Sequence, residues 1–221
     1  MQLHAVIVPP PGVVRAALEA ARDLAPPPPA PPELPKPGLV DRLLGRSRPD
    51  PVVPPAARLV PVDPETVFLR VAKFGNLTTP DAAALAESLA TAAASWPSPV
   101  VRVGRLVVGT DDPFDVTAQL EGDLDGLRAI HRNVNEVAER HRLYLDRRSF
   151  RSELALGSIE MEDGSAVPAE IAGSEVEHRG PNWLPYHLTL LRSSFAGGGT
   201  VLTEYARIDL AEDAEELGAL G

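Results

Sequence analysis

The chain has 221 residues, a length that fits one domain or two small lobes around one cleft, and 44% of its residues are hydrophobic. Its formal net charge of -10 opposes tight binding to a long polyphosphate backbone, so we expect no DNA partner, whereas a local basic patch could still hold a short nucleotide. The absence of cysteine excludes disulfides, thiolate metal sites and a cysteine nucleophile. The five histidines form no convincing metal-binding pair, so we expect neither a metal nor an organic cofactor.

The amino-terminal residues do not resemble a targeting segment. Met1 to Val8 contains no basic region of the kind that begins a secretion signal, and prolines follow at once. No apolar run approaches the roughly 20 residues that are needed to span a bilayer. The sequence therefore predicts a cytoplasmic protein without membrane contact.

The hydrophobic pattern predicts strands and helices in an irregular order. The expected strands are Leu3 to Val8, Arg58 to Val62, Val67 to Phe74, Val100 to Val108, Phe114 to Leu120, Ser152 to Ile159, Leu184 to Arg192 and Thr200 to Leu210. The expected helices are Val13 to Leu24, one capped by Thr79 that ends near Ser95, and one capped by Asp123. Hairpins at several joints favour an α+β architecture over a doubly wound sheet.

Two segments differ in composition from the rest of the chain. Residues 26–56 form a proline-rich insertion, in which Pro26 to Pro55 holds twelve of the 24 prolines. Two interpretations of this extended, polyproline-like segment are open: a solvated linker, or a docking arm for a protein partner. Residues 211–221 form an acidic tail that we expect to fray. We expect the remainder of residues 1–221 to form a single bilobal domain.

Three regions carry a resemblance to a known family. Glu65 to Asn76, which follows Arg58-Leu59-Val60-Pro61, resembles a motif usually written N-L-H-L-T-L-x-F-L-G. Arg148 to Leu156 resembles one usually written F-x-P-H-x-T-L, and Leu188 to Ser193 resembles a closing hairpin strand. These regions resemble the 2H phosphoesterases, which include the bacterial 2'-5' RNA ligases and cyclic phosphodiesterases. The resemblance implies two pseudo-symmetric lobes of antiparallel sheet with flanking helices, each offering one His-x-Thr motif to a central cleft.

The sequence departs from this family at the positions that carry its chemistry. Phe68 and Glu153 stand where the resemblance places the two catalytic histidines, and Arg70 and Ala155 stand at the two threonines. Phenylalanine cannot transfer a proton, so the resemblance implies a degenerate site that binds a nucleotide, a short RNA end or a protein partner. The alternative is a divergent cyclic phosphodiesterase or 2'-5' RNA ligase that uses Glu153, Arg70 and His187.

Each candidate residue also has a structural interpretation. Arg70 offers a planar fork for phosphate, or it forms an ion pair with Glu153 in place of the catalytic site. His187 begins a literal His-x-Thr string, either as a relocated catalytic group or as an exposed strand histidine. Arg148 and Arg151 belong to a basic group that either steers a phosphorylated ligand to the cleft or balances nearby acids.

Overall fold

The computed structural model describes residues 1–25, 56–146, 150–197 and 199–211. The helices and strands follow one another as β1 (Gln2–Ile7), α1 (Pro11–Ala21), η1 (Arg22–Leu24), β2 (Ala57–Pro61), η2 (Pro64–Thr66), β3 (Leu69–Asn76), α3 (Thr79–Ala93), β4 (Val101–Val108), β5 (Phe114–Gly122), α4 (Leu124–Arg140), β6 (Glu153–Met161), β7 (Glu175–Glu177), β8 (His187–Ala196) and β9 (Gly199–Asp209). Apart from Ala56 and Ala211, the proline-rich insertion and the acidic tail lie outside the described residues. Within the described ranges, no helix is long and apolar enough to cross a membrane.

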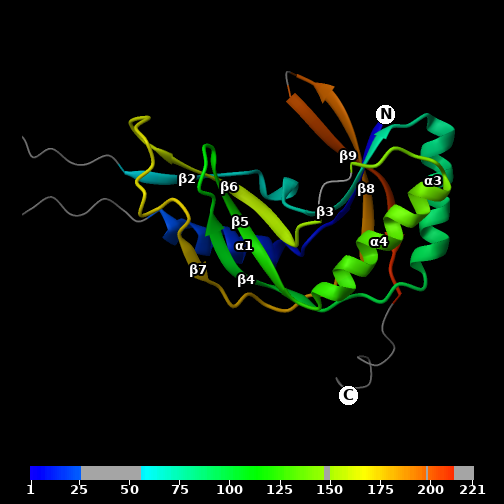
Figure 1. Ribbon diagram of the computed structural model, residues 1–221, viewed down its shortest axis with the longest axis horizontal. Helices are drawn as coiled ribbons and strands as arrows, with labels where there is room; N and C mark the ends of the chain where they lie inside the picture. The colour runs from blue at the N-terminus through cyan, green and yellow to red at the C-terminus, as the bar shows by residue number, and fades with distance from the viewer. Residues whose placement is uncertain (26–55, 147–149, 198, 212–221) are drawn as a thin grey trace, which may run out of the picture.

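The strands form two antiparallel sheets, which lie in different parts of the molecule (Figure 1). Sheet A has four strands in the order β3-β1-β8-β9, and sheet B has five in the order β2-β6-β5-β4-β7. Helix α1 packs against β4 and β6 of sheet B, whereas α4 packs against β3 and α3 packs against β9 of sheet A. This arrangement of two sheets, each with its own helices, confirms the predicted α+β fold.

Successive side chains of strand β1 point to opposite faces of sheet A. Leu3, Ala5 and Ile7 are fully buried and belong to the main hydrophobic core. His4 and Val6 alternate with them and therefore point to the opposite face of the sheet. That second face also carries Arg70 of the adjacent strand β3, a candidate site residue from the sequence, which is directly paired with Val6.

The sequence predicts most elements but not all of their bounds. Strand β8 runs from His187 to Ala196 instead of from Leu184 to Arg192, and it forms with β9 a hairpin that projects from the molecule (Figure 1). Strand β7, Glu175–Glu177, was not predicted, because three residues with two exposed glutamates show no strand pattern. It pairs with Arg105 to Val107 at the edge of sheet B.

The cap of helix α3 differs from the sequence prediction. Thr78, and not Thr79, is the capping residue: its Oγ1 accepts a hydrogen bond from the backbone N–H of Asp81 and donates one to the Asp81 carboxylate. Pro80 is consequently the second helical residue. The prediction for α4 is confirmed, since the carboxylate of Asp123 accepts a hydrogen bond from the Gly126 N–H at 2.8 Å.

The two adjacent threonines offer a matched test of this cap. Thr78→Ala removes the hydroxyl that satisfies a free N–H of the first turn, so it should lower the free energy of unfolding by about 1 kcal/mol. Thr79→Ala replaces the first helical residue and should change it by less than about 0.5 kcal/mol. Urea unfolding followed by circular dichroism measures both. A larger loss for Thr79→Ala than for Thr78→Ala would contradict the assignment.

Candidate functional site

The first motif strand places Arg70 in a row of side chains that crosses sheet A. Arg70 pairs with Val6 of β1, Val6 pairs with Thr189 of β8, and Thr189 pairs with Arg207 of β9. Directly paired residues in antiparallel strands project to the same face of the sheet, so these four side chains lie on one face. Arg70 is exposed, whereas Leu69 beside it is fully buried in the core. The row therefore presents two arginines on the face opposite the core.

His187 lies on the same face as Arg70. It precedes Thr189 by two residues on β8, and Leu188 between them is fully buried in the core. Its Nδ1 lies 2.8 Å from Oδ1 of Asp209, and the His187 side chain is 47% exposed. The histidine is thus an exposed strand residue with a carboxylate partner. Sequence reasoning missed Asp209, although its position opposite His187 follows once the hairpin register is known.

The second motif strand places Glu153 on sheet B. Glu153 pairs with Gln119 of β5, and Gln119 pairs with Arg105 of β4, so these three side chains form a row across that sheet. Ala155 is paired with Thr117 one step further along. The motif positions of the two lobes therefore belong to different sheets, as the resemblance implies.

Glu153, the first residue of β6, forms its ion pair with a residue that lies just before the strand. Its Oε1 lies 3.4 Å from Nη1 of Arg151, and its side chain is 29% exposed. The interpretation in which Glu153 pairs with Arg70 is not what the structure contains: Arg70 has no ion pair with any described residue. Arg151, two residues before Glu153 in the chain, is the nearer partner for this carboxylate.

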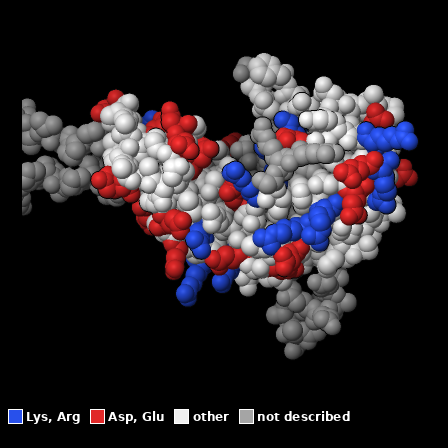
Figure 2. All heavy atoms as spheres, in the orientation of Figure 1, with Lys and Arg blue, Asp and Glu red and all other residues white. Residues whose placement is uncertain are grey.

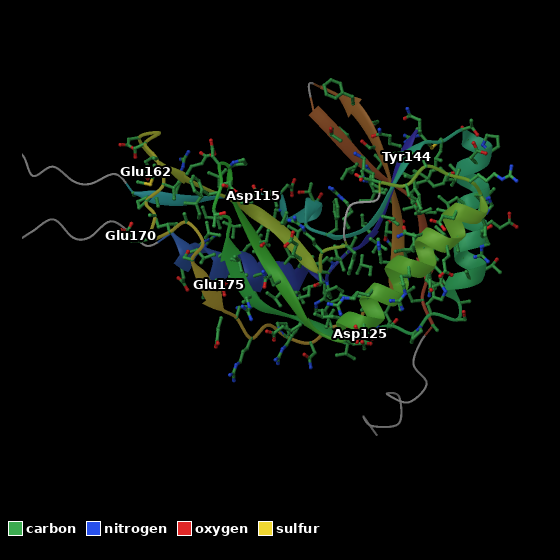
Figure 3. All side chains as sticks on the ribbon, viewed as in Figure 1. Asp115, Asp125, Tyr144, Glu162, Glu170 and Glu175 are labelled. Atoms are coloured by element: carbon green, nitrogen blue, oxygen red, sulfur yellow. The ribbon has the colours of Figure 1, made fainter. Side chains whose placement is uncertain are left out.

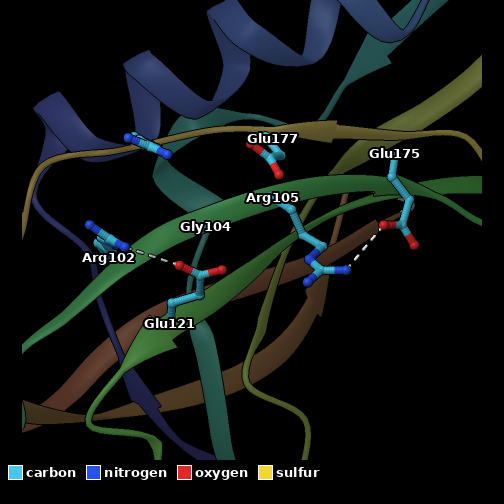
Figure 4. Close-up of a pocket in the computed structure, with 7 residues that line it drawn as sticks. Arg102, Gly104, Arg105, Glu121, Glu175 and Glu177 are labelled. Carbon is cyan, nitrogen blue, oxygen red and sulfur yellow. Dashed lines mark hydrogen bonds and ion pairs between the residues drawn. The ribbon is translucent and has the colours of Figure 1, made fainter.

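Two adjoining polar hollows lie over sheet B, with volumes of about 460 Å³ and 400 Å³. The first is lined by Arg105, Gln119, Leu120, Glu121, Leu124, Phe150, Arg151, Ser152 and Glu153. The second is lined by Arg102, Gly104, Arg105, Glu121, Glu175, Glu177 and Arg179, and it contains two ion pairs (Figure 4). These are the two ion pairs drawn in Figure 4, in which Arg102 lies 3.3 Å from Glu121 and Arg105 lies 3.1 Å from Glu175, among the residues that line the second hollow. Neither hollow is lined by Arg70 or His187.

The segment that leads to Glu153 is anchored between the lobes. The Phe150 ring stacks on His131 of α4 with ring centroids 5.0 Å apart. Nδ1 of His131 lies 2.7 Å from the carbonyl oxygen of Val71 in β3, and Nε2 lies 3.1 Å from Nδ2 of Asn135. The imidazole thus connects the second motif region to the strand that carries the first.

The charges are distributed unevenly between the lobes. Figure 2 shows acidic side chains gathered over the lobe of sheet B, and Figure 3 places Glu162, Glu170 and Glu175 there, with Tyr144 near sheet A.

Arg148, predicted to bind ligand, lies outside the described residues. In the part of the chain that the structure describes, no group of three or more histidines, cysteines or acids could hold a metal ion.

Comparison with known proteins identifies the fold. No protein-family model and no curated protein sequence matches the chain. Solved structures match it over almost its whole length. TT0787 of Thermus thermophilus has a TM-score of 0.61 and 18% sequence identity, over 96% of this chain and 100% of that chain. E. coli LigT complexed with 3'-AMP has a TM-score of 0.61 and 16% identity, over 95% and 97% of the two chains. A crystal structure described as a phosphoesterase has a TM-score of 0.58 and 17% identity, over 95% and 98%. The predicted resemblance to the 2H phosphoesterases is thus confirmed at the level of the fold, which this chain shares with E. coli LigT.

Proposed function

We propose that this protein is a catalytically degenerate relative of the 2H phosphoesterases, which binds a nucleotide or a short RNA end along the former active cleft. The observation that carries the proposal is the replacement of both motif histidines, by Phe68 and Glu153, in a chain with the LigT fold. One histidine acts as base and the other as acid in the family's chemistry, and each such group is worth about 10²- to 10⁴-fold in rate. Phe68 can do neither.

The geometry of the second motif supports the same proposal. Glu153 is an ionisable group, but Arg151 holds it in an ion pair, and a carboxylate alone supplies only half of an acid–base pair. Arg70 and His187 lie on the other sheet, and neither lines the hollow that contains Glu153. A divergent enzyme that uses these three residues needs them to converge on one phosphate.

A nucleotide ligand is suggested by structures that share this fold. Crystal structures of E. coli LigT contain 3'-AMP, ATP and NADP+. We extend this property to the present chain because Arg70 and Arg207 are exposed on the motif-bearing face of sheet A.

The proposed compartment is the cytoplasm, and the proline-rich insertion at residues 26–56 is the proposed docking arm for a protein partner. Microscopy of a tagged protein and co-purification with and without that segment test these two points.

The first prediction concerns catalysis. The purified protein should not hydrolyse nucleoside 2',3'-cyclic phosphates above the uncatalysed rate, and neither should Glu153→Gln or His187→Gln. Product formation is measured by chromatography over hours, with a 2'-5' RNA ligase that retains both motif histidines as the positive control. Turnover in the wild type that Glu153→Gln or His187→Gln abolishes would overturn the degenerate-site proposal and establish the divergent enzyme.

The second prediction concerns binding. Isothermal titration calorimetry and NMR should detect binding of 3'-AMP, with weaker binding at higher ionic strength because the interaction is electrostatic. Adenosine serves as the matched control, since it has the base and sugar without the phosphate. If neither 3'-AMP, ATP nor a short RNA binds, nucleotide binding fails, and a purely partner-binding role through residues 26–56 replaces it.

A further inference from the structure

A β-bulge in β3 places three basic side chains on one face of sheet A. Ala5 pairs with Ala72, but Val6 pairs with Arg70, so Val71 is the extra residue of the bulge. His4 pairs with Lys73. Because His4 and Val6 share a face of β1, their partners Lys73 and Arg70 share it too, although strict alternation along β3 would separate residues three apart.

Arg70 and Lys73 have no carboxylate partner among the described residues, a property that they share with several other arginines such as Arg15, Arg132 and Arg192. The ion pairs of the described residues are Arg58–Glu160, Arg102–Glu121, Arg105–Glu175, Arg128–Asp125, Arg151–Glu153 and Arg207–Glu204, together with His187–Asp209. Neither Arg70 nor Lys73 forms an ion pair or a side-chain hydrogen bond with a described residue. What distinguishes Arg70 and Lys73 is that the strand register brings them together on one face, where both remain available to an anion.

His4 lies beside both cations. The residue is 9% exposed and makes no side-chain hydrogen bond with a described residue. Burial, and then the positive charges of Arg70 and Lys73, lower the pKa of the imidazole below its ordinary value. His4 is thus close enough to both cations to interact electrostatically with them, although burial is the larger cause of its lowered pKa.

Three acidic residues lie on or beside this face, and two of them have basic partners of their own. Glu204 lies in the row of His4 and Leu191, but it is held by Arg207 at 2.9 Å. Asp209 of the same strand is held by His187 at 2.8 Å. Asp146 of the segment beside β3 donates its backbone N–H to the carbonyl oxygen of Lys73 at 3.0 Å.

We propose that His4, Arg70 and Lys73 form a subsite for a dianionic phosphate group, which binds more tightly when His4 is protonated. The inference rests on the proposed binding function and assigns the phosphate to one half of the former cleft. Arg70 supplies a planar fork for two phosphate oxygens, Lys73 a point charge, and His4 a donor that is added with its proton.

The direction of the pH dependence follows from linkage. A bound dianion offsets the positive field of Arg70 and Lys73, so it raises the pKa of His4 in the complex above that in the free protein. Binding is then accompanied by proton uptake, and affinity increases as the pH falls from above the His4 pKa of the complex to below that of the free protein. Each unit by which the anion raises this pKa increases the affinity by about tenfold at the acidic limit.

Sulfate is the probe for this pH dependence. It stays dianionic between about pH 5 and 8, whereas a phosphate monoester has its second pKa near 6 and would change charge itself. At constant ionic strength, sulfate should bind the wild type several-fold more tightly at the acidic end. His4→Gln should bind it with little pH dependence. Should that variant fold poorly, the wild type can be used instead. NMR titration of its His4 imidazole should then show a higher pKa for His4 in the presence of sulfate than in its absence. An unchanged His4 titration would overturn the proposal, and binding of sulfate elsewhere would then be that of an adventitious ion only.

Titration with 3'-AMP tests the two cations. Arg70→Gln and Lys73→Gln should each weaken binding by about tenfold or more, because a charge-assisted hydrogen bond is lost. Arg192→Gln is the matched control: this exposed arginine is on β8 of the same sheet, but it pairs with Leu3 and so projects to the opposite face. It should bind as the wild type does. Equal affinities of all three variants would overturn the subsite.

The same titration separates the two proposals. If 3'-AMP binds and shifts the amide resonances of Gln119 and Glu153 but not those of His4 and Arg70, nucleotide binding survives and the subsite on sheet A is wrong. If no nucleotide binds at any pH, both fail. If adenosine binds as tightly as 3'-AMP, the phosphate is not recognised, and this result also overturns the subsite.

Discussion

The helices that cover the two sheets are supplied by a chain that passes back and forth between them. Helix α4 is inserted between β5 and β6 of sheet B, yet it packs against β3 of sheet A, and α1 follows β1 of sheet A but packs against β4 and β6 of sheet B. A sheet must bury its apolar face against another layer, so sheet A depends on a helix tethered at both ends to sheet B. One continuous cluster of buried side chains includes residues of both sheets. This constraint fixes how the motif strands lie, independently of the side chains on their outer faces.

Side chains on the outer faces of these strands can differ without changing the fold, because of that independence. Arg70 and Ala155 are exposed, and Phe68 and Glu153 are half-buried, whereas the residues between and beside them, Leu69, Leu154 and Leu156, are fully buried. Alternation along a strand assigns the first set to the binding face and the second set to the core. Selection for stability acts mainly on the buried set, because changes at exposed sites alter the free energy of unfolding by only about 0.5 kcal/mol. The fold can therefore persist while the chemistry changes.

The sequence is informative where periodicity and capping determine structure, and less so where register does. Alternating hydrophobic residues predict β3 and β6, and Asp123 predicts the start of α4. The bulge at Val71 has no such signature, so sequence reasoning did not associate Lys73 or His4 with Arg70. Likewise, the alternative interpretation in which Arg70 pairs with Glu153 assumed an interaction across the cleft. A nearer partner two residues away, Arg151, competes for the same carboxylate. Which strand pairs with which, and in what register, depends on contacts far apart in the chain.

The outer faces of the two sheets differ in how the cations named above are compensated. Over sheet B, Arg102, Arg105 and Arg151 each face a glutamate. Each exposed pair is worth only about 0–1 kcal/mol, so breaking one costs little, but the displaced carboxylate stays nearby and repels an incoming anion. On sheet A, Arg70 and Lys73 have no such carboxylate among the described residues. An anion that approaches this protein against its overall negative charge therefore gains most on sheet A, where the positive field is not already satisfied.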